Sequence, residues 1–323
     1  NDSDGRGWLE SLEDQLERMK ATGEISKDAI ERHPRELKRA DVKLIKVIGS
    51  GAYGEVWKAQ LDEGDAHGAI PVAVKLVKST DEGRIKAENE LLAEAAVMSQ
   101  VGMHDNIVSL IGVVYVDKPV MLVQTFCEHG SLLDVLVARA AGETCAGSNM
   151  PFTVKDRNKF LLETAHGMTH ISQHFVHRDL AARNVLVDAT MSCKVADFGL
   201  SRALGKPKHK TMGNESESEY YRSAAGVYPI RSTAVEAMSE SIFSTASDVW
   251  SWGTFAIEVY QDGVRPYDSH ANKGLQMMIF QGLRPEHPAK CPVEVYDLLK
   301  TCWLHTPSER PDFYSIAKTM KQL

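Results

Sequence analysis

The pattern of apolar and polar positions changes character about a third of the way along the chain. From residue 42 to about 122, short runs rich in β-branched residues alternate with polar turns, which predicts strands. The expected strands cover residues 42–48, 55–60, 72–77, 107–116 and 120–124. Within this part, the stretch 83–100 is rich in Ala, Glu and Leu and predicts a helix.

After Gly130 the pattern becomes mostly helical, with helices expected over residues 131–141, 154–173, 245–261, 272–281 and 292–302. A strand-rich part with one helix, followed by a helix-rich part, predicts an α+β protein with two lobes. We expect one main domain over 39–323. Its parts are a first lobe at about 39–125, a hinge at about 125–130 and a second lobe at about 131–323.

The first 38 residues form a charged flank of this domain. Leu9, Leu12, Leu16 and Met19 recur at helical spacing with charged residues between them, which predicts an amphipathic helix. Two interpretations remain open. The flank is either a solvated helical segment or a regulatory segment that docks on the main domain.

Composition narrows the classes of protein. The formal net charge of −7 gives no reason to expect binding to nucleic acid. The five cysteines lack CxxC spacing, so we expect a reducing, intracellular setting with neither a zinc site nor a disulfide framework. No apolar run approaches the roughly 20 residues needed to span a bilayer. Because the sequence begins at Asn1, we expect a segment of a longer protein, with a membrane span upstream left open.

Residues 177–184 are the most informative segment for chemistry. They bring together an acid, an amide and two guanidinium groups, namely Asp179, Asn184, Arg178 and Arg183. Phosphoryl transfer needs such groups: a carboxylate for the proton of the nucleophile, an amide for a metal and fixed positive charge near anions. Asp197 follows shortly after, and its carboxylate suits Mg²⁺, which uses few protein ligands.

Two features upstream fit the same chemistry. Gly49, Gly51 and Gly54 form a Gly-x-Gly-x-x-Gly loop, whose backbone N–H groups can approach phosphates closely. The loop lies between two expected strands rather than before a helix, which argues against a dinucleotide site; a glycine-rich hairpin is the alternative. Lys75 lies in an apolar strand and is costly to bury unpaired, so we expect Glu94 of the next helix to pair with it.

These motifs, in this order, resemble the protein kinase family over roughly residues 37–323. The resemblance implies a bilobal protein-kinase fold, with a β-rich N-lobe that carries one regulatory helix and a mainly helical C-lobe. It implies ATP and Mg²⁺ as cofactors. Arg183 stands where tyrosine kinases place an arginine, and Pro229-Ile230-Arg231 resembles their substrate platform, so the chain is most similar to tyrosine kinases, the receptor type above all.

The resemblance also assigns roles to single residues. Asp179 would orient the proton of the attacking hydroxyl with help from Arg183, Lys75 and Glu94, while Asn184 and Asp197 would hold Mg²⁺. Asp248 would brace the 177–184 loop, and Glu236 would pair with Arg310. The residues implied to bind ATP are Ile48, Gly49, Gly51, Gly54, Val56, Ala73, Lys75, Gln124, Thr125, Cys127 and Leu186.

Regulation and departures from the family are expected downstream. Tyr220 matches the usual autophosphorylation position, with Tyr221 beside it, and Arg178 and Arg202 are the expected acceptors of the phosphate charge. Three positions depart from the family pattern, namely Ser232 for Trp, Val235 for Pro and a long polar Gln124 at the back of the adenine site.

The sequence therefore predicts a protein-tyrosine kinase that acts on protein substrates, with self-association for trans-autophosphorylation and SH2-type readers as further partners. We expect it on the cytoplasmic side, as the intracellular part of a single-pass receptor or otherwise in the cytoplasm. Two alternatives remain: a kinase-fold scaffold or weakly active pseudokinase that binds partners, and a serine/threonine kinase.

Overall fold

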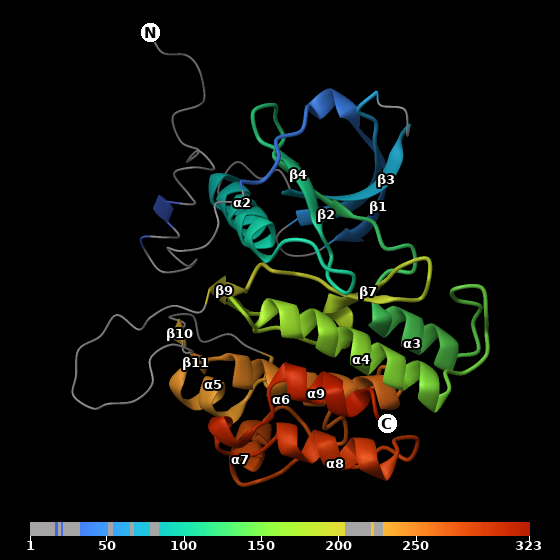
Figure 1. Ribbon diagram of the computed structural model, residues 1–323, viewed down its shortest axis with the longest axis vertical. Coiled ribbons are helices and arrows are strands. Elements are labelled where there is room, and N and C mark those ends of the chain that lie inside the picture. Colours follow the sequence, from blue (N-terminus) through green and yellow to red (C-terminus); the bar gives the residue numbers. More distant parts are fainter. Residues whose placement is uncertain are drawn as a thin grey trace. The chain divides into compact units, whose positions relative to one another are not determined.

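The computed structural model forms two compact units (Figure 1). The first unit contains Asn1–Met103 and Val108–Cys127, and the second contains His104–Ile107 and Glu128–Leu323. The structure describes residues 17–18, 21, 33–50, 54–64, 68–77, 84–203, 221–222 and 229–323. Most of the predicted flanking helix lies outside these residues, although Glu17, Arg18 and Ala21 are helical.

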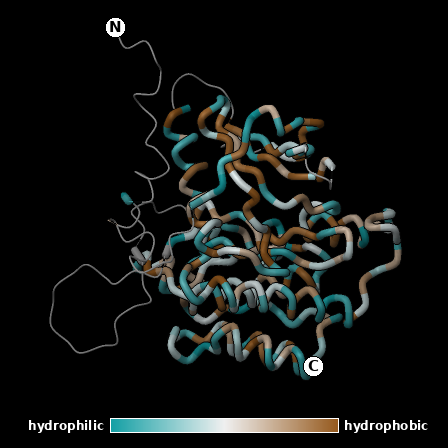
Figure 2. The backbone as a smooth tube through the Cα atoms, turned by 45° about the horizontal axis from the view of Figure 1, so that its top comes forward, coloured by the Kyte–Doolittle hydropathy of each residue, from teal (hydrophilic) through white to brown (hydrophobic). Residues whose placement is uncertain are grey.

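The first unit is built on an antiparallel sheet with the strand order β1-β2-β3-β5-β4. Its strands are β1 (Val42–Ser50), β2 (Gly54–Leu61), β3 (Ile70–Val77), β4 (Leu110–Val114) and β5 (Met121–Thr125). All five lie where the sequence predicts strands. One face carries an apolar core that includes Val72, Val74 and Val123, and Figure 2 shows apolar stretches along these strands.

The end of the N-terminal flank adds to this sheet. Leu37 N donates to Val113 O at 2.7 Å, and Val113 N donates to Arg35 O at 2.8 Å, which places the segment beside β4. The Leu37 side chain is buried in the apolar core. A 3₁₀ turn, η1 (Arg39–Asp41), then leads into β1. Leu37 is therefore packed into the sheet of this unit, whereas Arg35 and Glu36 are exposed.

Helix α2 (Arg84–Val101) is the long helix of the first unit and packs on β3, β4 and β5. It is the helix that the sequence predicts over 83–100. Its buried residues include four consecutive positions, Ala95 to Met98, so the helix is enclosed on more than one side.

The second unit is mainly helical. Its helices are α3 (Leu132–Ala140), α4 (Val154–Ile171), α5 (Val235–Glu240), α6 (Thr245–Tyr260), α7 (Leu275–Phe280), α8 (Val293–Cys302) and α9 (Phe313–Met320). Helix α6 is buried along almost its whole length and packs on α4 and α8. The sequence analysis missed α5 and α9, although Asp312 caps α9 by accepting from Ser315 N at 2.7 Å. Helix α7 begins later than predicted because Gly274, with φ of +83°, precedes it.

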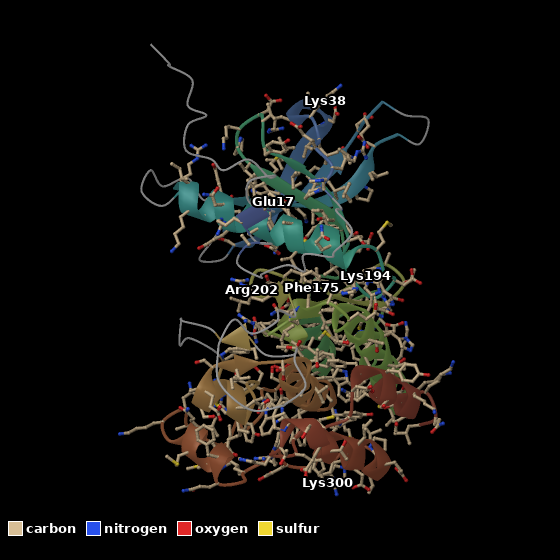
Figure 3. All side chains as sticks on the ribbon, turned by 60° about the vertical axis from the view of Figure 1, so that its left-hand side comes forward. Glu17, Lys38, Phe175, Lys194, Arg202 and Lys300 are labelled. Atoms are coloured by element: carbon tan, nitrogen blue, oxygen red, sulfur yellow. The ribbon has the colours of Figure 1, made fainter. Side chains whose placement is uncertain are left out.

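Short strand pairs and two 3₁₀ turns complete the second unit. The pairs join β6 (Phe175–Val176) to β9 (Arg202–Ala203), β7 (Val185–Val187) to β8 (Cys193–Val195) and β10 (Tyr221–Arg222) to β11 (Ile242–Phe243). The turns are η2 (Ala182–Asn184) and η3 (Pro307–Glu309). Phe175 and Arg202, labelled in Figure 3, mark the first of these pairs.

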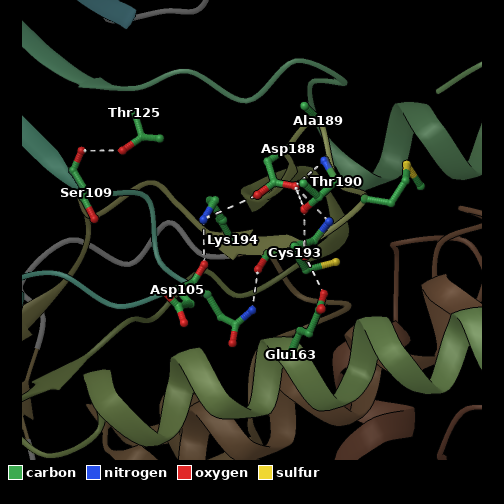
Figure 4. Close-up of polar contacts among 12 residues, drawn as sticks. Asp105, Ser109, Thr125, Glu163, Asp188, Ala189, Thr190, Cys193 and Lys194 are labelled. Atoms are coloured by element: carbon green, nitrogen blue, oxygen red, sulfur yellow. Dashed lines mark hydrogen bonds and ion pairs between the residues drawn. The ribbon is translucent and has the colours of Figure 1, made fainter. Parts of the chain in front are cut away.

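The segment His104–Ile107 belongs to the second unit although the sequence analysis places it in the first lobe. Val195 N donates to Asn106 O at 2.9 Å, and Asn106 Nδ2 donates to Cys193 O at 3.1 Å. Lys194 Nζ donates to Asp105 O at 2.7 Å (Figure 4). These bonds to β8 explain why β4 begins only at Leu110.

The predicted α+β architecture, with a strand-rich first part and a helical second part, is confirmed. Within the described part of the chain, none of the helices combines the length and the apolar character that a membrane crossing requires.

Candidate active site

The 177–184 loop is held at its start by a buried carboxylate from helix α6. Asp248 is fully buried, and its two oxygens accept the backbone N–H of His177 at 2.7 Å and of Arg178 at 2.8 Å. Arg178 has φ of +72°, a conformation that costs energy for a residue with a side chain. Because Asp248 bonds both N–H groups around this peptide, it holds the strained turn in place, as the sequence predicts for this residue.

Burial also changes the acidity of this carboxyl group. It raises the pKa of Asp248 to about 6, even though His177 and the two N–H donors favour the ionised form. The group is therefore ionised at neutral pH but carries a desolvation cost.

A second carboxylate from α6 holds the other end of the loop. Glu258 Oε2 accepts the N–H of Ala182 at 2.7 Å, where the loop turns into η2. Burial raises the pKa of Glu258, while the bond from Ala182 and the charge of Arg183 oppose that shift. The sequence analysis missed Glu258. An acidic residue inside the apolar end of a predicted buried helix was the signal that could have found it.

Within this loop, the structure brings Asp179, Arg183 and Asn184 together. Arg183 forms an ion pair with Asp179 Oδ1. Asn184 Nδ2 donates to Asp179 Oδ2 at 2.8 Å and to the backbone oxygen of Asp179 at 2.7 Å. The carboxylate of Asp179 is thus oriented from both sides by its own loop.

Asp197 is connected to the same loop through its neighbours. Ala196 N donates to Asn184 O at 2.8 Å, and His177 Nε2 lies 3.0 Å from Ala196 O. The buried ring of Phe198 packs edge-on against His177, with ring centroids 5.7 Å apart. Asp197 itself has φ of +65°, so a second non-glycine residue of the site lies in the left-handed region.

The donor set of this region fits a magnesium ion. The Nδ2 group of Asn184 is fixed by two acceptors, which leaves the amide oxygen as the ligand atom. Asp197 adds a carboxylate from the segment bonded to Asn184. One amide oxygen and one carboxylate match the few protein ligands that Mg²⁺ takes when substrate phosphates and waters supply the rest.

In the first unit, Lys75 and Glu94 form the ion pair that the sequence predicts. Lys75 Nζ lies 2.5 Å from Glu94 Oε1, with the side chains 21% and 8% exposed. Strand register places Val56 opposite Lys75, and Gln124 opposite Ala73. Since directly paired residues share a face, and residues two apart along a strand do too, these four side chains lie on one face of the sheet. This is the face opposite the core around Val72 and Val74.

The other predicted nucleotide-binding residues are distributed over both units. Ile48, at the end of β1, is 44% exposed, Thr125 ends β5, and Cys127 is buried. Leu186 lies on β7 in the second unit. Gly51 lies outside the described residues.

Of the two described loop glycines, Gly54 has a steric requirement. A Cβ there would meet Leu76 O at 2.1 Å, whereas at Gly49 a Cβ would make only ordinary contacts with Val56. Gly54 is therefore needed to pack β2 against β3, independently of any phosphate.

The predicted regulatory residues are only partly described. Tyr220 lies outside the described residues, whereas Tyr221 pairs through its backbone with Phe243 in the β10–β11 ladder. The guanidinium of Arg178 lies over the Phe243 ring, 4.8 Å from its centroid. Arg202 Nη1 donates to Ser201 O at 2.8 Å.

Ser232 and Val235, which depart from the family pattern, lie close in sequence to Glu236, which forms a buried ion pair with Arg310. Arg310 bonds both carboxylate oxygens of Glu236, at 2.7 and 2.8 Å, which is the predicted pair. Val235 is the first residue of α5, where the backbone N–H has no helical partner in any case, so Val and Pro fit equally well. Ser232 O accepts from Ser251 Oγ at 2.8 Å, so this backbone is tied to α6 without a large aromatic ring.

Comparisons with known proteins agree with this geometry. The family model of protein tyrosine and serine/threonine kinases matches residues 42–320. The chain is 36% identical over 303 residues to ephrin type-B receptor 1-A of Xenopus laevis and to ephrin type-A receptor 3 of Danio rerio, in each case over 94% of the chain. It is also 36% identical over 290 residues to ephrin type-A receptor 1 of Homo sapiens, over 90% of the chain.

The matched region is one part of these relatives, because the chain spans 27–29% of their length. It contains both the sheet with its Lys75–Glu94 pair and the braced loop around Asp179. The fold, the order of the motifs and the family match all agree, and the resemblance to receptor-type kinases is confirmed by the three receptors. The chain belongs to the protein tyrosine and serine/threonine kinase family.

Proposed function

We propose that this chain is a protein-tyrosine kinase that transfers the γ-phosphate of ATP to tyrosine hydroxyls of protein substrates. The observation that carries the proposal is the orientation of Asp179 by Arg183 and Asn184, on a loop that Asp248 and Glu258 hold at both ends. Fixed geometry of this kind is what phosphoryl transfer requires, because most of its catalysis comes from positioning and electrostatics.

In the proposed reaction, Asp179 orients the tyrosine hydroxyl and accepts its proton. The phenolic oxygen forms the new bond to the γ-phosphorus, and the bond to the oxygen bridging the β- and γ-phosphates breaks, so ADP leaves with that oxygen. Lys75, held by Glu94, binds the α- and β-phosphates. Arg183 adds positive charge beside the acceptor and keeps Asp179 in place.

The remaining roles follow from the family. Asn184 and Asp197 would hold Mg²⁺, which supplies charge neutralisation at the phosphates when bound. The glycine loop would cover the phosphates. Besides the glycine loop and Lys75, the residues proposed to contact the nucleotide are Ile48, Val56, Ala73, Gln124, Thr125, Cys127 and Leu186.

Tyrosine as the acceptor is supported by Arg183 and by the platform at Pro229-Ile230-Arg231. Arg231 donates to Pro266 O at 2.7 Å and to His270 O at 2.8 Å, so it ties the platform to the segment after α6. The similarity to ephrin receptors supports an intracellular position in a single-pass receptor, with 39–323 as the catalytic domain and 1–38 as its flank.

Activation by autophosphorylation at Tyr220, with or without Tyr221, is part of the proposal. The added negative charge would be bound by Arg178 and Arg202. Self-association would allow one copy to phosphorylate another, and SH2-type domains would read the phosphotyrosine. The double variant Tyr220→Phe with Tyr221→Phe should remain at the unactivated rate after incubation with ATP. A rate equal to that of the activated wild type would overturn this part.

The test of the main proposal is transfer of radioactive phosphate from ATP to a Glu-Tyr polymer in the presence of Mg²⁺. We expect Asp179→Asn to lower kcat by about a thousandfold while the melting temperature stays close to the wild-type value. A parallel reaction uses a mixed protein substrate that contains serine, threonine and tyrosine, and phosphoamino-acid analysis of its product should find phosphotyrosine. Transfer to serine or threonine there would indicate a serine/threonine kinase, and no transfer to either substrate by the wild type would indicate a kinase-fold scaffold.

A further inference from the structure

Helix α2 has a second ionic attachment besides the Lys75–Glu94 pair. Glu88 lies one turn into the helix and is 3% exposed. Its Oε2 accepts Lys118 Nζ at 2.8 Å, and its Oε1 accepts Arg84 Nε at 3.0 Å. Lys118 belongs to the turn between β4 and β5, so this contact joins the helix to the edge of the sheet.

Only one of the two partners of Glu88 can fix the position of α2 relative to the sheet. Arg84 is on the same helix, four residues earlier, and therefore cannot position the helix relative to anything else. Lys118 is the partner in the sheet. Glu88 is almost fully buried while Lys118 is 37% exposed, and a buried carboxylate is costly without its counter-charges, so removing Lys118 should cost more than breaking a fully exposed pair does.

Apolar packing holds the two halves of α2 differently. In the N-terminal half, Leu91 and Leu92 are buried on the same face as Glu88, while Lys86 and Glu90 are exposed. Towards the C-terminus every position from Glu94 to Met98 is buried, so this turn has no single apolar face. Polar contacts therefore add to the apolar face of the N-terminal half in selecting the rotation that presents Glu94 to Lys75.

The carboxylates of Glu88 and Glu94 attach α2 to the sheet from different sides of the helix. Glu88 and Glu94 are separated by six residues, which corresponds to about 240° around the helix and about 9 Å along it. Two attachments so placed restrain both the rotation and the axial position of α2, and the Glu88 contact adds to the packing of Leu91 and Leu92 in holding the N-terminal half.

We infer that Lys118 is a positioning residue: through Glu88 it holds α2 in the orientation in which Glu94 meets Lys75. The inference rests on the proposed function, since the orientation of Lys75 matters for catalysis only if Lys75 binds ATP phosphates. It names a contact outside the nucleotide-binding residues as a determinant of their geometry.

The experiment compares Lys118→Met with Lys86→Met on the full chain. Lys86 is on the same helix, but its pair with Glu90 spans 3.9 Å and both side chains are exposed, so it is the matched control. We expect Lys118→Met to weaken the binding of Mg-ATP, measured by calorimetry, about fivefold. The KM for ATP should rise to match while the KM for the Glu-Tyr polymer stays unchanged, and Lys86→Met should change neither.

Two further measurements separate positioning from general loss of stability. In a Glu94→Gln background, Lys118→Met should add no further loss of ATP affinity, because the pair through which it acts is already broken. Hydrogen exchange should accelerate over residues 84–101 in Lys118→Met, and Lys118→Arg should restore slow exchange. If Lys118→Met does not fold, Glu88→Gln replaces it in the same assays.

The outcomes are distinct for the two proposals. An inactive wild type that still binds ATP would remove the proposed function but leave the ATP-affinity test of Lys118 intact. An active wild type, together with unchanged ATP affinity in both Lys118→Met and Glu88→Gln, would overturn the role of Lys118. Additive losses in the Glu94→Gln background would also overturn it, because Lys118 would then act by another route.

Discussion

The candidate residues of the second unit and those of the first unit are held by different kinds of bonds. In the second unit, three backbone N–H groups of the 177–184 loop, those of His177, Arg178 and Ala182, donate to two carboxylates of one buried helix. In the first unit, Lys75 of β3 and Glu94 of α2 are joined only through their side chains.

This difference predicts which of the two groups, the 177–184 loop or the Lys75–Glu94 pair, can change its geometry without unfolding. A carboxylate that bonds backbone N–H groups fixes the peptides themselves, and the loop must be unfolded to move it. A side-chain pair between a strand and a helix depends on several rotatable bonds and on the position of the helix. We therefore expect the 177–184 loop to behave as part of the core of its unit, and the Lys75–Glu94 pair to respond to anything that displaces α2.

Removing the anchor of the loop should have the largest effect. Asp248→Ala leaves the buried N–H of His177 and the part-buried N–H of Arg178 without an acceptor, at about 1–3 kcal/mol each, so we expect the free energy of unfolding to fall by about 3 kcal/mol. Denaturant titration measures it. Asp297→Ala is the control, since Asp297 and its partner Lys300 are exposed, and it should cost less than about 0.5 kcal/mol. Similar losses for the two variants would show that Asp248 does not anchor the loop.

The pH dependence of the free energy of unfolding gives a second test of Asp248 as the buried anchor of the loop. The pKa of Asp248 is raised from its ordinary value of 3.8 to about 6 in the folded state. Its contribution to stability is therefore complete below pH 3.8 and is lost as the pH rises through about 6, a loss of about 3 kcal/mol in all. Between pH 4.5 and 7.5 the wild type should lose about 2 kcal/mol relative to Asp248→Asn, which has no such titration. A difference between the two proteins that does not vary with pH would contradict the burial of an ionised Asp248.

The same contrast explains what could be predicted from the sequence. Strands β1 to β5 and helix α2 follow from local patterns of β-branched and helix-forming residues, and Lys75 with Glu94 follows from the cost of an unpaired charge. The role of Asp248 came from the family resemblance. Two short elements were missed: α5 has only six residues, whereas α9, with eight, has its apolar residues Phe313, Ile316, Ala317 and Met320 at helical spacing and could have been found.

Contacts between distant segments could not be predicted from the sequence. Glu258 bonds Ala182, 76 positions earlier; an acid in a buried helix indicates that it needs a partner, but not which segment supplies one. The same holds for Asn106, whose bonds to β8 assign His104–Ile107 to the second unit, and for Leu37, which fills the core of the sheet. Each depends on the approach of chain segments that only the folded structure specifies.

Breaking the adjustable pair should leave the anchored loop intact. Lys75→Met should weaken Mg-ATP binding about thirtyfold, or about 2 kcal/mol, because a charge-assisted contact to phosphate is lost and Glu94 is left without Lys75. Calorimetry measures the affinity, and Lys43→Met, an exposed lysine of the same sheet, is the control. Hydrogen exchange of residues 177–187 should stay slow. Faster exchange there would mean that the two parts are not independently held.

The smallest expected effect concerns Gln124, which shares the sheet face of Ala73 and Lys75 and is 5% exposed. Its backbone is fixed in β5, so a change of its side chain alters the space on this face without moving the strand. Gln124→Thr shortens the side chain and should strengthen binding of inhibitors that extend behind the adenine site about fivefold, or about 1 kcal/mol. A compact inhibitor without that extension serves as the control and should bind both proteins equally. Because Lys75 and Glu94 keep their contact in this variant, the KM for ATP should change less than it does in Lys75→Met. Equal affinity of the extended inhibitor for the wild type and the Gln124→Thr variant would show that this side chain does not limit the space behind the adenine site.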